Sequence, residues 1–168
     1  TPFSESYSHV GMATKKNHKW FVLEAIPKNG VVLTSLNKFL NRNKAKFNKY
    51  ETSVARLDSN YNVYISDAIN FGLEKINSPY DNLFTWDDSS YYCSELIYKM
   101  FSFQNLSKDS LPFETNLMTF NDSTGRPMQS WVNYYKSLNY EIPEGKIGTN
   151  PNLIASSAHI KFIHDYDN

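Results

Sequence analysis

The segment Tyr91–Phe101 constrains the fold most, because it predicts an amphipathic helix that begins beside the single cysteine of the chain. Its apolar residues recur at helical spacing: Leu96, Ile97, Met100 and Phe101. Cys93 lies at the head of this helix, where unpaired amide groups and the helix dipole favour a thiolate over a thiol. The cysteine is therefore either a nucleophile or a small buried apolar side chain, and its position alone leaves both interpretations open.

A cysteine nucleophile needs a base, and the base needs a group that orients it. The histidines of the chain are His9, His18, His159 and His164. His9 belongs to a short strand-like run, 7–12, and the apolar run 20–26 reads as a buried strand. The polar residues between the two runs predict a β-hairpin whose turn is longer than the tightest two-residue type.

Glu24 is an acidic residue inside the otherwise apolar strand 20–26, and burying it costs free energy unless it has a partner. If the two runs pair, Glu24 lies on a strand next to His9, and an imidazole N–H is a natural partner for the carboxylate. The alternative is a solvated Glu24 and a His9 with a purely structural hydrogen bond. His159 and His164 flank an expected strand, 160–163, and are expected to be structural or exposed.

Four short motifs follow one another along the chain: Ser8-His9-Val10-Gly11-Met12, Leu23-Glu24-Ala25, Pro79-Tyr80-Asp81 and Tyr91-Tyr92-Cys93-Ser94-Glu95-Leu96. This ordered set resembles the circularly permuted NlpC-type cysteine hydrolases, the YiiX/YebB-like branch of the papain-like superfamily. The histidine precedes the cysteine, which is the reverse of the order in papain. The segments 142–151 and 154–157 are similar to the same branch, so the resemblance spans nearly the whole chain.

The resemblance implies an α+β, permuted papain-like fold, in which a small antiparallel sheet packs against helices and the nucleophile lies at a helix N-terminus. It implies a cysteine peptidase or amidase with Cys93 as nucleophile, His9 as base and Glu24 as the third polar residue. The expected reaction is hydrolysis of amide bonds through a thioester, and no metal or organic cofactor is required.

Two aromatic residues near Cys93 are candidates for contact with a substrate. The backbone N–H of Cys93 is the natural first donor to an oxyanion, and Tyr91, two residues earlier, is a candidate second contributor. Trp86 is a candidate for lining a substrate cleft. For both aromatic residues, packing against the helix or the core is an equally good interpretation. The adjacent Asp87 and Asp88 are expected to be solvated in a loop, and they make only a weak case for a cation site.

The substrate remains open among a peptide, an amino-acid amide and an acyl lipid. The resemblance to NlpC-type enzymes implies cleavage of amide bonds in cell-wall peptides. Such a substrate favours a bacterial envelope or secreted location over the cytoplasm. The related lecithin:retinol acyltransferase-like proteins share the permuted arrangement and imply lipid acyl transfer. Family members have a further stretch ahead of the histidine, whereas eight residues precede His9, so we expect the N-terminal part of the family domain to be missing. A catalytically silent binding protein of the same fold is the competing class.

Composition agrees with a small enzyme. A length of 168 residues predicts one domain, 1–168, with a sizeable core to which 15% aromatic residues contribute. The formal net charge of zero argues against a general nucleic-acid-binding protein. No run of 18 apolar residues is present, so no membrane-spanning segment is predicted. One cysteine forms no internal disulfide, and cysteine content therefore leaves the redox compartment open.

The remaining segments alternate between strands and helices. Short strands are predicted at 31–33 and 54–57, and a helix is predicted to begin at Leu36 after a Thr34 or Ser35 cap. The basic residues of that helix, from 38 to 49, are expected to form a solvated face. A second helix is predicted to begin at a Ser66 cap and to end before Pro79, and a loop, 80–90, leads into the cysteine helix.

Overall fold

The computed structural model describes residues 7–47 and 50–166. Its strands are β1 (Met12–Lys16), β2 (Lys19–Ile26), β3 (Gly30–Ser35), β4 (Ser53–Leu57), β5 (Asn116–Leu117), β6 (Ile147–Gly148) and β7 (Ile160–Asp165). Its α-helices are α1 (Leu36–Phe47), α2 (Asn62–Glu74), α3 (Cys93–Ser102), α4 (Gln129–Ser137) and α5 (Pro151–Ala155), and short 3₁₀ turns are formed by Ser59–Tyr61 and Lys108–Ser110. No helix within these two ranges is both long and apolar enough to cross a membrane.

The three N-terminal strands form an antiparallel sheet in the order β1-β2-β3. The predicted hairpin is present, but the expectation of a longer turn was wrong, because Asn17 and His18 alone connect β1 to β2. Both residues have positive φ, 48° and 62°, and a two-residue turn with two positive φ angles matches the twist of the paired strands. The residues around His9 precede β1, so His9 reaches the sheet from a neighbouring segment and not from within a strand.

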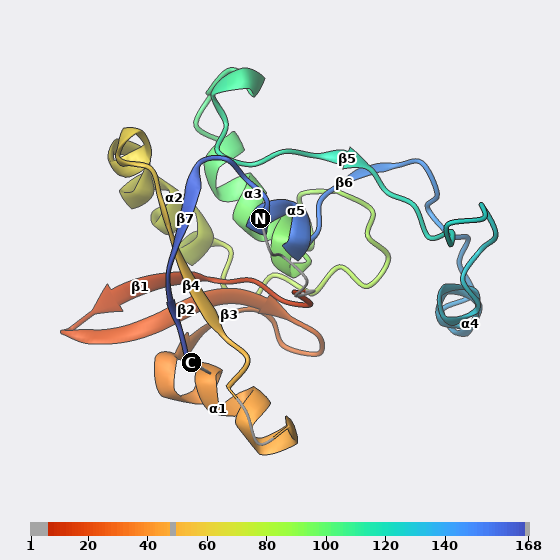
Figure 1. Cartoon of the computed structure of the whole chain (residues 1–168), viewed down its shortest axis with the longest axis horizontal. Coiled ribbons are helices and arrows are strands. Elements are labelled where there is room, and N and C mark those ends of the chain that lie inside the picture. Colours follow the sequence, from red (N-terminus) through yellow and green to blue (C-terminus); the bar gives the residue numbers. More distant parts are fainter. Residues whose placement is uncertain (1–6, 48–49, 167–168) are drawn as a thin grey trace.

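The three-stranded sheet is covered on both sides, by α2 and α3 on one side and by α1 on the other (Figure 1). This arrangement explains why four consecutive residues of β2, from 22 to 25, are buried. Alternate side chains of a strand point to opposite faces. Leu23 and Ala25 belong to the main core with Leu96 and Met100 of α3, and Glu24 belongs to the opposite face.

The second helix begins one turn earlier than predicted, at Asn62 and not after Ser66. Tyr64 and Ala68, four residues apart, extend its apolar face toward the core, so packing continues the helix through the polar Ser66. The remaining strands form two small antiparallel pairs, β4 with β7 and β5 with β6. The architecture is therefore α+β with small antiparallel sheets. Figure 1 shows α4 lying apart from the three-stranded sheet, at the other end of the molecule.

Candidate active site

His9 and Glu24 form a close ion pair at the edge of the sheet. His9 Nε2 lies 2.6 Å from Glu24 Oε2, and the Glu24 side chain is fully buried whereas His9 is 26% exposed. Because Nε2 faces the carboxylate, the other ring nitrogen is left for a second partner. The prediction that a buried Glu24 takes an imidazole N–H as its partner agrees with this geometry.

Cys93 supplies that second partner from α3. It is the first residue of the helix, it is 6% exposed, and it lies close enough to His9 to contribute to the raised pKa of that imidazole. As a first-turn residue it has a backbone N–H without an intrahelical acceptor. The structure therefore brings together Cys93, His9 and Glu24, which lie far apart in the sequence.

The electrostatics of the two partners favour a charged pair. Burial opposes protonation of His9, but hydrogen bonds with Cys93 and Glu24, and the charges of both groups, raise the His9 pKa from 6.5 to about 9. Burial also opposes ionisation of Glu24, but hydrogen bonds from Arg42, His9 and Thr34 lower the Glu24 pKa to about 2. At neutral pH, an imidazolium therefore lies between a buried carboxylate and the Cys93 sulfur.

Gly11 allows the segment that carries His9 to lie directly against β2. A Cβ atom on Gly11 would lie 2.5 Å from Val22 Cγ1, 3.1 Å from the Leu23 carbonyl oxygen and 3.2 Å from Glu24 Cβ. The first separation is far shorter than a carbon–carbon contact. A glycine at this position therefore sets how closely His9 approaches Glu24.

Replacing Gly11 with alanine is expected to displace His9 from Glu24 and Cys93. We expect alkylation of Cys93 by iodoacetamide at pH 7 to slow by about 10- to 100-fold, since a displacement of about 1 Å has effects of this size on reacting groups. Overpacking is also expected to lower the free energy of unfolding by about 1–3 kcal/mol. The exposed neighbour Ala13→Ser is the control, and an unchanged alkylation rate in Gly11→Ala would show that this contact does not position His9.

Two residues that the sequence did not assign to the site lie in it. Arg42 of α1 contacts Glu24 through both terminal nitrogens, Nη2–Oε1 at 2.6 Å and Nη1–Oε2 at 2.9 Å. Arg42 is exposed, as expected for the basic residues of this helix, but its guanidinium also contacts a buried carboxylate, which the sequence did not indicate. The sequence signal was that Arg42 is the single arginine among the lysines of this segment, and arginine is the residue suited to a forked contact with a carboxylate.

Tyr80 is the second unassigned residue of the site. Its pKa is raised by burial first and by the charge of Cys93 second, so its side chain lies within electrostatic reach of the nucleophile. The backbone of Tyr80 bridges to Tyr91 in a parallel arrangement, which joins the beginning of the loop 80–90 to its end. The motif Pro79-Tyr80-Asp81 had marked this position without indicating a role.

The loop 80–90 is held in place by two carboxylates. Asp81 is buried and accepts the N–H groups of Leu83 (2.9 Å) and Thr85 (2.6 Å). Asp87 accepts from the backbone and hydroxyl of Ser89, and these hydrogen bonds lower its pKa to about 2. The acidic residues of this loop therefore organise its backbone.

Tyr91 and Trp86, the two aromatic candidates for contact with a substrate, lie in different environments. Tyr91 is fully buried; its hydroxyl donates to the Asp88 carbonyl oxygen (3.0 Å) and its N–H to that of Pro79 (3.0 Å). Both donors of Tyr91 are therefore already paired, which argues against their use at an oxyanion. Trp86 is half-buried, and its ring packs beside those of Tyr92 and Tyr98.

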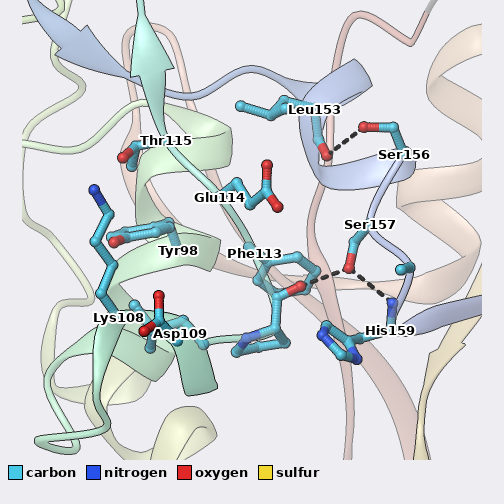
Figure 2. A pocket seen from close by; sticks show the side chains of 13 residues that line it. Tyr98, Lys108, Asp109, Phe113, Glu114, Thr115, Leu153, Ser156, Ser157 and His159 are labelled. Atoms are coloured by element: carbon cyan, nitrogen blue, oxygen red, sulfur yellow. Dashed lines mark hydrogen bonds between the residues drawn. The ribbon is translucent and has the colours of Figure 1, made fainter.

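The other three histidines lie outside this cluster. His18 and His164 are exposed, and half-buried His159 lies 3.4 Å from an Asp58 carboxylate oxygen. A pocket of about 500 Å³ lies between α3, α5 and the segment 108–115, and Ser157 and His159 are among its lining residues (Figure 2). Cys93, His9 and Glu24 do not line it. In the part of the chain that the structure describes, no group of three or more His, Cys, Asp or Glu side chains is arranged to hold a metal ion.

Known proteins provide an independent comparison. A family model described as "Permuted papain-like amidase enzyme, YaeF/YiiX, C92 family" matches residues 2–164. The "Uncharacterized protein YiiX" of Escherichia coli (strain K12) is 30% identical over 96 residues, which are 56% of this chain and 45% of that protein. The matched region thus spans less than half of the length of that relative.

A solved structure shares the fold. The structure titled "Crystal structure of metalloprotein yiiX from Escherichia coli O157:H7" matches with a TM-score of 0.72 at 23% identity, over 94% of this chain and 82% of that chain. The resemblance read from the sequence and the predicted permuted papain-like α+β fold are confirmed by these matches. Because the family model matches nearly the whole chain, this chain belongs to the YaeF/YiiX (C92) family of permuted papain-like amidases.

Proposed function

We propose that this protein hydrolyses amide bonds of peptides or amino-acid amides through a thioester on Cys93. One observation carries the proposal: His9 lies 2.6 Å from the buried carboxylate of Glu24 and is close enough to Cys93, at the start of α3, for the two side chains to interact. Nucleophile, base and orienting group in hydrogen-bond contact are the arrangement that covalent acyl transfer needs. The family description, an amidase, supports the bond type.

In the first half of the reaction, the Cys93 thiolate attacks the amide carbonyl carbon. The resulting oxyanion accepts a hydrogen bond from the Cys93 backbone N–H. His9, protonated at neutral pH, donates its proton to the departing nitrogen. The carbon–nitrogen bond breaks, the amine leaves, and the acyl group remains on the sulfur.

In the second half, neutral His9 removes a proton from water as the water oxygen attacks the thioester carbon. The carbon–sulfur bond breaks, the carboxylic acid leaves, and His9 and the thiolate regain their charged pairing. Glu24 keeps the ring nitrogen that faces it protonated and stabilises each imidazolium that forms.

Intact-mass spectrometry after rapid acid quenching tests the proposal with a panel of dipeptides, amino-acid amides and short-chain acyl lipids. We expect dipeptides or amino-acid amides to give a transient acyl adduct and free amine in the wild type, and neither product in Cys93→Ala. Because Cys93 is the single cysteine, iodoacetamide labelling reports on the same atom. Adducts from acyl lipids alone would overturn the amide assignment. A thiol that forms no adduct with any compound would make a binding protein the better interpretation.

A further inference from the structure

We propose that Arg42 is a positioning residue of this site, which holds Glu24 ionised and aims its second oxygen at His9. The inference rests on the proposed function, in which His9 acts as the proton carrier for Cys93. It adds a fourth member to the group, supplied by a helix whose other described side chains are half-exposed or exposed.

The contact geometry supports this role. Glu24 has no exposed surface, and its contacts come from two separate parts of the chain. Arg42 of α1 contacts both oxygens, and His9 of the N-terminal segment contacts Oε2. His9 in turn faces Cys93 of α3. Arg42 Nη2 therefore binds Oε1, whereas Oε2 is shared between Arg42 Nη1 and the His9 imidazole.

The reaction cycle explains why a permanent cation is needed there. When His9 has given its proton to the leaving group, it is neutral, and Glu24 would be a buried carboxylate without a counter-charge. A buried carboxylate without a counter-charge is unfavourable, and binding a proton relieves that cost. A protonated Glu24 no longer stabilises the imidazolium in the next step. Arg42 stays charged throughout, because a guanidinium does not lose its proton in this pH range.

Arg42 lies partly at the surface and also packs against a residue that contacts His9. Its side chain is 38% exposed, and its guanidinium carbon lies 5.4 Å from the ring centroid of Phe39. The Phe39 ring in turn lies 6.0 Å from the His9 ring. The same helix therefore contacts both members of the His9–Glu24 pair, one through packing and the other through charge.

Three variants on α1 test the inference. Arg42→Gln removes the cation, Arg42→Lys retains a charge without the fork, and Lys38→Gln removes an exposed cation from the same helix. For Arg42→Gln we expect kcat to fall by about 10- to 100-fold with little change in KM. Loss of a residue that orients a metal-binding side chain has effects of this size, and Arg42 orients Glu24 in a comparable way. We expect the acid limb of Cys93 alkylation by iodoacetamide to move up by about one pH unit or more.

The conservative variant separates charge from geometry. Arg42→Lys is expected to restore most of the acid limb and only part of kcat, because an ammonium does not form the two parallel contacts. Lys38→Gln is expected to match the wild type in both measurements. Circular dichroism and urea unfolding verify that each variant is folded.

The outcomes distinguish the two proposals. A wild type with no amide turnover that depends on Cys93 overturns the proposed function. An active wild type with the same pH profile and kcat as Arg42→Gln overturns the role of Arg42 alone. Alkylation needs no substrate, so its acid limb is measured in either case, and an unshifted limb in a folded Arg42→Gln protein contradicts the inference.

Discussion

His9→Ala is expected to reduce amide hydrolysis by about 10³-fold or more and to slow alkylation of Cys93 at pH 7. The variant removes the imidazole that lies beside Cys93 and that, in the proposed reaction, carries the proton to the leaving nitrogen. Steady-state kinetics and the iodoacetamide rate measure the two effects separately. The matched control is His18→Asn, an exposed histidine in the hairpin turn, where asparagine tolerates the positive φ of 62°.

The pH dependence gives this prediction a second readout. The raised His9 pKa means that its contribution to stability is complete below about 6.5 and is lost as the pH rises through about 9. Hydrolysis is expected to decline over the same alkaline range, because deprotonated His9 cannot protonate the leaving nitrogen. His9→Ala should lack this loss of stability in urea unfolding between pH 6.5 and 9. Full hydrolytic activity in His9→Ala would show that another group serves as the base.

Lys99→Met is expected to lower the free energy of unfolding by about 3–5 kcal/mol, since it leaves a buried carboxylate without its cation. Lys99 Nζ lies 2.7 Å from Glu95 Oε1, and Glu95 is fully buried. The same ammonium donates to the Asp87 carbonyl oxygen at 2.6 Å and lies 2.9 Å from Asp88. Lys99 therefore ties the first turn of α3 to the loop 80–90, and urea unfolding measures its contribution.

The sign of the pH dependence identifies the mechanism of this destabilisation. Burial outweighs the Lys99 contact and raises the Glu95 pKa from 4.5 to about 7. A raised carboxyl pKa means that folded-state stability falls as the pH rises from about 4.5 through 7. Without Lys99 the charged form is still less favourable, so we expect a larger loss at pH 8 than at pH 5.

Two further variants serve as controls for Lys99→Met. Adding Glu95→Gln should recover part of the lost stability, because the buried charge is removed together with its partner. The exposed Lys136→Met on α4 should change the free energy of unfolding by less than about 0.5 kcal/mol. Equal losses in Lys99→Met and Lys136→Met would show that the pairing with Glu95 does not stabilise the fold.

Local patterns in the sequence predicted several of the helices and strands. The period of apolar residues after Cys93 predicted α3, the continuous run 20–26 predicted β2, and the predicted strands at 31–33 and 54–57 lie within β3 and β4. These patterns succeed because a helix or strand must turn its apolar side chains toward one core. Element boundaries were less accurate. The turn at Asn17 and the start of α2 depended on backbone conformations and packing that composition does not specify.

For the candidate site, the sequence by itself determined the residue types and their order: a cysteine at a helix start, a histidine ahead of it, and an acidic residue in an apolar strand that needed a partner. Tertiary structure decided which other groups meet them. In the sequence, Arg42 is one cation of an expected solvated face. Only the packing of α1 against β2 brings its guanidinium into contact with both carboxylate oxygens of Glu24. Tyr91 looked free to donate, and only the closure of the loop 80–90 uses both of its donors. The physical reason is the same in both cases: local periodicity specifies which side of an element is buried, whereas pairing between polar groups depends on distances across elements that are remote in the chain.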